Sequence, residues 1–490
     1  MGKMKLFAGI LFGLVLAFQL FNLTTISLWH DEAFSALLIR YDDYGEMLHR
    51  IGLDVHPPLY YMILRIWASA FGDSLFSLRS FSLFFGLLGM AATFALAKEI
   101  FQKRNLAFFS ALILGMNSFQ IQYHLEARMY TLATFFILLA TFFLIRGLKT
   151  QIPSWRFSLL IGAYALSGAA ALYTHYYSVF ALAAHALFAL YLLRFQIKKL
   201  GFVGVGFVAS GILFLPWLPT FLRQLSQVQA SYWIPPINRW SIPTTISKMT
   251  TGDGFNPDQA AFLIILIGVL VLAAFLWMLS RYPQRERWIL PFLFLMPFLG
   301  SFLLSLKTSI YLDRYFIFYL PYLVITLVAA LFAIPNPKVR SLLLMLALAG
   351  ATVSYPLHTS SWRLSEKPGM AGASSYLLSS LHSQDTILAT SSFVYFTFRY
   401  YNTSSTHPLV YAPSDLPHFS GTALLNKEDI ARSSENIAQP GNTVWTIDTT
   451  GFGNFQPAPP ESWQKLQEKE FPDAYPHRGS VIVRKYLIGI

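Results

Sequence analysis

The chain has 490 residues, of which 55% are hydrophobic and only 12% are charged, and its mean hydropathy is +0.49. Soluble globular domains carry about 25% charged residues, so this composition excludes a cytosolic enzyme, a secreted module and a nucleic-acid-binding protein. The formal net charge of +12 must therefore be interpreted by where the cations lie relative to a membrane. The sequence has no cysteine, which excludes disulfides, thiolate metal sites and a catalytic thiol.

Apolar runs predict about eleven membrane-spanning helices before residue 357, since about 20 apolar residues are needed to cross a bilayer. The first run, 6–26, follows the basic residues Lys3 and Lys5. We interpret it as a retained helix and not as a cleaved signal peptide, because no small-residue cleavage site precedes Trp29. The remaining runs cover 77–97, 106–119, 129–146, 157–173, 177–194, 201–222, 260–280, 288–306, 312–333 and 340–356.

Positive charge is concentrated in alternate loops between these runs, whereas the opposite loops hold slightly more acids than cations. Loops rich in lysine and arginine stay in the cytoplasm. The pattern predicts a cytoplasmic N-terminus and, with an odd number of spans, an extracytoplasmic C-terminal segment. The cationic loops contain Lys3, Lys5, Lys98, Lys103, Arg104, Arg146, Lys149, Arg156, Arg194, Lys198, Lys199, Arg281, Arg285, Arg287, Lys338 and Arg340.

This topology predicts two domains in an integral protein of the inner (plasma) membrane. A transmembrane domain covers 1–356 and includes a long first extracytoplasmic loop over 27–75, and an extracytoplasmic domain covers 357–490. The second segment contains short runs of β-forming residues, which predict a small α/β domain. These runs are 386–389, 393–398, 444–447 and 481–483.

Polar residues of the first outer loop lie at its two ends. Asp31 and Glu32 directly follow the first span, where adjacent acids are costly unless they face water, a cation or a reacting group. The alternative is that they only solvate a helix end. At the other end, paired prolines predict the start of a short amphipathic helix over 59–71. His56 would lie at the positive end of that helix, either as a phosphate ligand or as a simple cap.

The second outer loop carries Glu126, Arg128 and Tyr130 at alternate positions. An extended backbone would point these three side chains the same way, whereas a helix would leave Arg128 on another face. Arg128 at the membrane boundary matches the bidentate capture of a phosphate, and a buried ion pair is the alternative.

The later outer loops add aromatic and basic residues. His175 lies among tyrosines, as a site residue or as part of an aromatic belt at the interface. The loop over 223–258 is long, aromatic and glycine-punctuated, as a mobile substrate-covering loop would be. Arg314 begins a late span. Because these loops converge on one face, we predict a site there. The predicted substrate-binding residues are Tyr60, Tyr61, Tyr130, His175 and Tyr315.

Several motifs taken together resemble those of one family. They are the acidic pair after the first span, His-Pro-Pro-Leu-Tyr-Tyr before the second, Glu-Ala-Arg-Met-Tyr before the fourth, and Asp-Arg-Tyr at the start of a late span. In this order they resemble the GT-C glycosyltransferases, specifically the bacterial branch akin to protein O-mannosyltransferases and lipid A aminoarabinose transferase. The resemblance covers about residues 5–335 and implies a GT-C fold with an extracytoplasmic tail.

The resemblance implies transfer of a hexose or pentose from a polyprenyl-phosphate donor to an acceptor of the cell envelope, outside the cytoplasm. Asp31 would be the general base that deprotonates the acceptor hydroxyl, in a single displacement that inverts the anomeric configuration. Glu32 completes the family's acidic pair, and Glu126 falls where the family has a further acid. The positions that match its phosphate-binding groups are His56, Arg128 and Arg314.

The motifs and the resemblance also lead to expectations about cofactors and partners. A divalent ion at Asp31 and Glu32 stays open, because two adjacent acids are too few ligands to argue for one. The sequence has no P-loop or dinucleotide motif, which agrees with a lipid-linked donor. Val55 and His56 replace the Glu-Lys of aminoarabinose transferases, which argues against aminoarabinose as the sugar. The expected partners are the donor, membrane lipids and a protein, lipid or glycan acceptor, without nucleic acid. The alternative function is a transporter or flippase of a lipid-linked sugar.

Overall fold

The computed structural model describes residues 2–230, 233–252, 255–359, 367–434, 437–474 and 479–489, and the chain folds into two compact units. The helical unit comprises Met1–Leu20, His56–Tyr60 and Arg79–His358. The sheet unit comprises Phe21–Val55, Tyr61–Leu78 and Thr359–Ile490. Each unit therefore joins segments that are far apart in the sequence.

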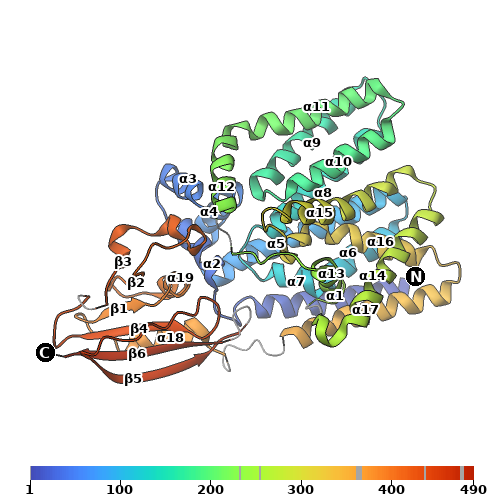
Figure 1. Cartoon of the computed structure of the whole chain (residues 1–490). Helices are drawn as coiled ribbons and strands as arrows, with labels where there is room; N and C mark the ends of the chain where they lie inside the picture. The colour runs from blue at the N-terminus through green and yellow to red at the C-terminus, as the bar shows by residue number, and fades with distance from the viewer. Residues whose placement is uncertain are drawn as a thin grey trace. The chain divides into compact units, whose positions relative to one another are not determined.

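The helical unit consists of helices that pack side by side, with α8 against α9, α9 against α11 and α10 against α15 (Figure 1). Its helices, which lie wholly or mainly in the unit, are α1 (Gly2–Asn22), α5 (Leu75–Phe101), α6 (Arg104–Met116), α7 (Ser118–His124), α8 (Tyr130–Lys149), α9 (Trp155–Thr174), α10 (Ser178–Leu193), α11 (Ile197–Phe214), α12 (Leu218–Ala230), α13 (Ser241–Thr251), α14 (Pro257–Arg281), α15 (Ile289–Ser305), α16 (Leu320–Phe332) and α17 (Pro337–Thr359). Short 3-10 helices are η1 (Leu215–Trp217), η2 (Arg285–Trp288) and η3 (Asp313–Tyr319).

The predicted polytopic helical architecture is confirmed. Within the described ranges, nine helical stretches are long and apolar enough to cross a membrane. The shorter apolar helices α6 and α10 occupy the two remaining predicted spans. Where one span was predicted over 201–222, helix α11 continues through η1 into α12, so the helical stretch is longer than expected.

Several of these helices present apolar side chains outward. Val208 on α11 and Phe262 and Leu272 on α14 are 62%, 79% and 59% exposed. Such continuous apolar faces are unfavourable in water but match the hydrocarbon of a bilayer, and a helix satisfies its own backbone hydrogen bonds there. The exposed faces therefore support a membrane location for the helical unit.

A buried histidine fixes how α5 lies against α7. The Nδ1–H of His124 donates to Gln19 Oε1 at 2.8 Å, and its Nε2 accepts from the Gln120 side-chain amide at 2.9 Å. A Cβ atom at Gly86 would overlap the imidazole ring. Glycine at this position on α5 therefore allows the close approach that satisfies both ring nitrogens.

The sheet unit is built on a six-stranded mixed sheet of order β3-β2-β1-β4-β6-β5 (Figure 1). Strands β1, β2, β3 and β4 pair in parallel, whereas β6 pairs antiparallel with both β4 and β5. The register of β5 shifts between Lys465 and Gln467. The strands are β1 (Thr386–Ala389), β2 (Leu409–Tyr411), β3 (Ile430–Ala431), β4 (Thr443–Thr449), β5 (Trp463–Pro472) and β6 (Ser480–Ile488). The predicted small α/β domain is therefore confirmed.

Helices complete the sheet unit. They are α2 (His30–Leu38), α3 (Tyr44–Leu53), α4 (Leu59–Phe71, with its first residues in the helical unit), α18 (Gly369–Ser379) and α19 (Ser392–Tyr401), with 3-10 helices η4 (His418–Ser420), η5 (Thr422–Leu424) and η6 (Lys427–Asp429). Helix α4 has the bounds predicted from the paired prolines, whereas α2 and α3 were not predicted. Helix α19 packs on β1, β2 and β4, and α18 packs on β5 and β6.

One predicted strand is wrong. The run 393–398 belongs to α19, although its aromatic and β-branched residues favour a strand. The helix begins after Ser391, whose side chain accepts the Val394 N–H. Phe393 and Phe396, three residues apart on one helical face, both contact the His30 ring of α2, at 4.5 and 5.7 Å between ring centroids. Tertiary packing and an N-cap therefore outweigh local strand propensity.

Candidate active site

The backbone around Arg128 is neither extended nor helical, so neither of the two predicted alternatives holds. Residues 125–128 form a bend between α7 and α8. The Arg128 N–H donates to the Glu126 carbonyl at 2.8 Å, and Ser82 of α5 donates to the Arg128 carbonyl at 3.3 Å. The bend therefore fixes Arg128 at the start of α8.

Arg128 and His56 meet although they are far apart in the sequence. Guanidinium NH2 of Arg128 lies 3.3 Å from His56 Nε2, and Arg128 is only 3% exposed. The His56 carbonyl accepts from the side chain of Gln224 on α12 at 3.4 Å. A guanidinium and an imidazole at one point form a donor-rich site of the kind that holds a phosphate.

His175 forms the centre of an aromatic cluster next to this pair. Its ring lies 4.8 Å from that of Tyr315, 6.1 Å from that of Tyr130 and 6.4 Å from that of His56, measured between centroids. Its Nδ1 accepts the Tyr177 N–H at 3.2 Å. Burial, and then the charges of His56 and Arg128, hold the pKa of His175 well below its usual value. The ring is therefore neutral, with Nε2–H as its donor.

Tyr177 and Gln224 are site residues that the sequence did not single out. Besides its contact with His175, Tyr177 donates from its hydroxyl to the Ile310 carbonyl at 2.7 Å and accepts Tyr319 Oη–H on its own carbonyl at 2.8 Å. Gln224, which is 1% exposed, accepts the hydroxyl of Tyr176. Tyr177 begins a predicted span and Gln224 lies in a predicted outer loop, but a run of tyrosines does not indicate which member supports the histidine.

The other predicted basic residue, Arg314, lies in η3 and is half-buried. Its guanidinium carbon lies 5.6 Å from the centre of the Trp233 ring, within cation–π range. The neighbouring Asp313 forms an ion pair with Lys248 of α13. The Asp-Arg-Tyr motif is therefore tied to the long fourth outer loop through two of its members.

Tyr60 and Tyr61 are consecutive and fully buried, but they belong to different units. The Tyr60 ring packs on Phe81 at 5.8 Å, and the Tyr61 ring packs on Phe34 at 6.4 Å. Glu126 is also buried, and its carboxylate accepts from the Gln122 side chain at 3.4 Å. The two tyrosines therefore pack against other rings, whereas Glu126 holds the side chain of Gln122.

The two adjacent acids differ from one another. Both lie in the first turn of α2, in the sheet unit, but Glu32 is fully buried and its carboxylate accepts the Trp29 N–H at 3.3 Å. Asp31 is half-buried, with part of its surface open to solvent. The segment before the helix is held by Leu28 N–H, which donates to the Tyr401 hydroxyl at 2.8 Å. The structure therefore makes Asp31 the more accessible carboxylate of the pair.

No group of three or more histidine, aspartate or glutamate side chains in the described ranges is arranged to hold a metal ion. The predicted donor-phosphate residues His56 and Arg128 come together with Tyr130, His175 and Tyr315 in the helical unit. The acidic pair belongs to the sheet unit.

Part of the chain matches a known protein family. Residues 55–219, which include His56, Arg128 and His175, match the family described as dolichyl-phosphate-mannose-protein mannosyltransferase. No curated protein matches the chain in a sequence comparison.

Solved structures identify the fold. ArnT from Cupriavidus metallidurans in the apo state superposes with a TM-score of 0.64 at 11% identity, covering 98% of this chain and 97% of that chain. The same protein bound to undecaprenyl phosphate gives 0.61 at 12% identity, covering 97% of each chain. The archaeal oligosaccharyltransferase AglB from Archaeoglobus fulgidus, in complex with an inhibitory peptide and a dolichol-phosphate, gives 0.51 at 12% identity, covering 81% of this chain and 63% of that one.

The chain is therefore an integral membrane protein with the GT-C fold. Within that class its architecture is that of ArnT over almost the whole chain, including a small C-terminal mixed sheet. The predicted fold class and the predicted resemblance to this bacterial branch are confirmed.

Proposed function

We propose that the protein transfers a sugar from a polyprenyl-phosphate donor to an acceptor on the extracytoplasmic face of the membrane. The observation that carries the proposal is the part-buried contact between Arg128 and His56, within the segment that matches the mannosyltransferase family. A guanidinium and an imidazole that meet at one point can both donate to the oxygens of a lipid carrier's phosphate. The ArnT structure that holds undecaprenyl phosphate has the same fold and supports this class of donor.

In the proposed reaction, the carboxylate of Asp31 accepts the proton of the acceptor hydroxyl as its oxygen attacks the anomeric carbon. The bond from that carbon to the phosphate oxygen breaks, and the configuration at the carbon inverts. Arg128, His56 and Arg314 stabilise the negative charge that develops on the departing lipid phosphate.

The remaining predicted residues take supporting roles in this proposal. The neutral His175 donates from Nε2 towards substrate, while the tyrosines at 130 and 315 hold its ring. Tyr60 and Tyr61 shape the start of α4. Glu32 and Glu126 keep the backbone before α2 and the side chain of Gln122 in place.

A divalent ion at Asp31 and Glu32 would require further ligands, because Glu32 is buried and already accepts the Trp29 N–H. We therefore derive no step through a metal. The sugar is a hexose or pentose, and the acceptor is a protein, lipid or glycan of the cell envelope. In the proposed orientation the protein lies in the inner (plasma) membrane with its N-terminus in the cytoplasm. Residues 1–356 form the transmembrane domain, and residues 357–490 form the extracytoplasmic domain.

The test is transfer of radiolabelled sugar from a synthetic polyprenyl-phosphate mannose to membrane acceptors by the purified full-length protein in lipid nanodiscs. We expect Asp31→Asn to slow transfer by about 10²- to 10⁴-fold, the range for loss of a general base. Asp43→Asn is the matched control, because it lies in the same loop and asparagine replaces aspartate well as the N-cap of α3.

A wild-type rate in correctly folded Asp31→Asn would show that another group is the base. Absence of transfer by the wild type, together with movement of the labelled donor between leaflets of sealed vesicles, would instead favour the transporter alternative.

A further inference from the structure

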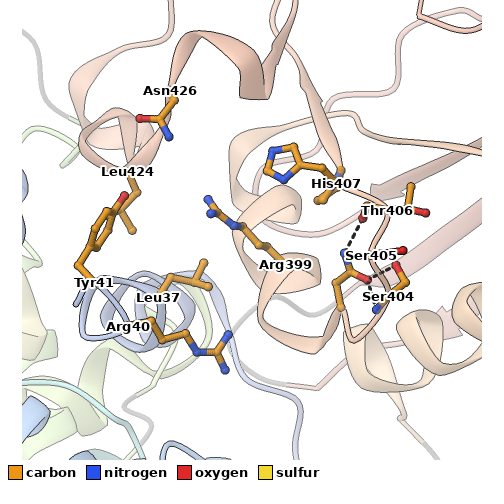
Figure 2. A pocket seen from close by; sticks show the side chains of 12 residues that line it. Leu37, Arg40, Tyr41, Arg399, Ser404, Ser405, Thr406, His407, Leu424 and Asn426 are labelled. Atoms are coloured by element: carbon orange, nitrogen blue, oxygen red, sulfur yellow. Dashed lines mark hydrogen bonds between the residues drawn. The ribbon is translucent and has the colours of Figure 1, made fainter. Parts of the chain in front are cut away.

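A pocket of about 410 Å³ opens in the sheet unit (Figure 2). It lies between the end of α2 and the segment that joins α19 to β2. Its walls also include Arg399 of α19, Leu424 of η5 and Asn426, which precedes η6. Pockets for small ligands have volumes of about 300–1,000 Å³, so this one has room for a monosaccharide with a substituent.

One wall of the pocket is a loop with a fixed shape. The side-chain amide of Asn402 donates to the Thr406 carbonyl at 2.9 Å. Its oxygen accepts both the backbone N–H and the hydroxyl of Ser404, at 3.0 and 2.7 Å. These bonds, drawn as dashed lines in Figure 2, hold residues 402–406 as a preformed rim that carries hydroxyl groups.

The pocket is basic. None of the residues that line it is acidic, whereas Arg40, Arg399 and His407 all contribute to the wall. Arg40 pairs with Asp73 at 2.7 Å, and His407 pairs with Asp429 at 2.6 Å. In the part of the chain that the structure describes, Arg399 pairs with no carboxylate. Its guanidinium donates to the Tyr395 hydroxyl at 3.4 Å and lies 5.8 Å from the centre of the same ring. The positive charge of Arg399 is therefore left for a ligand.

Two further features define the ligand. The Asn426 side-chain oxygen accepts from Arg50 at 2.8 Å, so the amide nitrogen is the group that remains to donate into the pocket. Figure 2 shows Tyr41 and Leu424 on the side opposite Arg399, as an apolar wall. Cationic and amide donors, rim hydroxyls and an aromatic ring together match a sugar that carries a phosphate or a carboxylate.

We propose that this pocket binds an anionic sugar and that the sugar belongs to the acceptor of the transfer reaction; the second half of this statement rests on the proposed function. Arg399 binds the anionic group through its planar fork of N–H donors. Asn426 and the rim hydroxyls bind the sugar hydroxyls, and Tyr41 packs against the C–H face of the ring. Of the possible acceptors, the proposal therefore selects an acidic glycan or glycolipid.

Direct binding to the full-length protein in nanodiscs tests the pocket itself, by saturation-transfer NMR with glucose 6-phosphate, glucuronate and uncharged glucose. We expect the two anionic sugars to bind the wild type and glucose to bind at least tenfold more weakly. Arg399→Gln should weaken the anionic sugars at least tenfold. The matched control is Arg432→Gln, which removes an exposed arginine of the same unit that pairs with Asp415 and does not line the pocket.

Equal binding of glucose and glucose 6-phosphate, or unchanged binding to Arg399→Gln, would overturn the assignment. A preference for phosphate over carboxylate, or the reverse, identifies which anion the acceptor carries.

The role in transfer is tested separately. Glucose 6-phosphate should inhibit transfer by the wild type competitively towards the membrane acceptor and not towards the donor, and Arg399→Gln should abolish this inhibition. Inhibition that competes with the donor would exclude the acceptor role. If the wild type transfers no sugar at all, the proposed function fails, whereas the binding measurement still decides whether the pocket holds an anionic sugar.

Discussion

Arg128 of the helical unit and two arginines of the sheet unit lie in opposite environments. Arg128 in the helical unit is 3% exposed and lies against His56, whereas the side chains of Arg40 and Arg432 in the sheet unit are 40% and 53% exposed and pair with aspartates. Exposed ion pairs contribute about 0–1 kcal/mol, while removal of a charge from water costs several kcal/mol. A buried arginine is therefore a much stronger indication of function than a paired surface arginine.

The strongest test of this contrast is Arg128→Lys. Lysine keeps the charge but cannot present two parallel N–H groups or reach His56 with the same geometry. We expect transfer to slow by about 10²- to 10³-fold, the effect of losing one preorganised donor to developing charge. Initial rates at saturating donor measure it, and Arg104→Lys on the exposed start of α6 is the matched control. Comparable rates for both variants would remove the distinction between buried and exposed arginines.

The next test concerns packing in the helical unit. Gly86→Ala places a methyl group against the ring of His124, and overpacking of this kind costs about 1–3 kcal/mol. Gly89→Ala, one turn further along α5, meets only Leu138 at 4.0 Å and should be neutral or slightly stabilising. Tm in detergent measures the difference. If Gly86→Ala melts at or above the wild-type Tm, the close approach of the two helices is not required.

The smallest expected effect is a difference between the two units in how stability depends on pH. Burial holds the pKa of His175 well below its usual value, so the unfolded chain binds a proton that the folded chain does not, and stability falls as pH drops below about 6.5. Burial raises the pKa of Asp448 on β4 to about 6, in spite of its ion pair with Arg484. For Asp448 the folded state binds the extra proton, so its contribution to stability grows as pH falls from about 6 to 4.

Two variants separate these opposite dependences of stability on pH. His175→Asn keeps an acceptor for the Tyr177 N–H but does not titrate, and we expect its Tm to fall less than that of the wild type between pH 7 and 5. Asp448→Asn should lose the gain in stability on acidification. Tm profiles of the three proteins measure this. Parallel profiles for wild type and His175→Asn would indicate that His175 is protonated in the folded state.

Local patterns in the sequence predict some elements correctly. Runs of apolar residues located the spans, and paired prolines located the start of α4 at Leu59. Local patterns fail where tertiary contacts override local preference, as in 393–398, whose aromatic residues form a helical face against His30. Helices α2 and α3 are short and lack a long apolar run, so periodicity did not reveal them.

The sequence suggested residues for the candidate site but not how they lie relative to one another, and their roles stay predictions. His56 and Arg128 were each predicted as phosphate ligands, but only the folded chain brings them within 3.3 Å. Asp31 and Glu32 are equivalent in the sequence, and burial alone distinguishes them. The contacts of Tyr177 with Ile310 and of Gln224 with His56 could not be predicted, because they join residues from different parts of the fold. The pocket around Arg399 combines α2 with a loop more than 350 positions later, which no local pattern indicates.

The edges of the six-stranded sheet have a consequence for how the protein behaves at high concentration. At one edge, β3 is only two residues long. At the other, β5 carries the exposed charged residues Lys465, Glu468, Lys469 and Glu470 and is interrupted by its register shift. Short, charged or irregular edge strands do not template the addition of a further strand from a neighbouring molecule. The sheet therefore ends within its own chain, and we expect crowding in the membrane to leave these domains separate rather than to join them into extended β-structure.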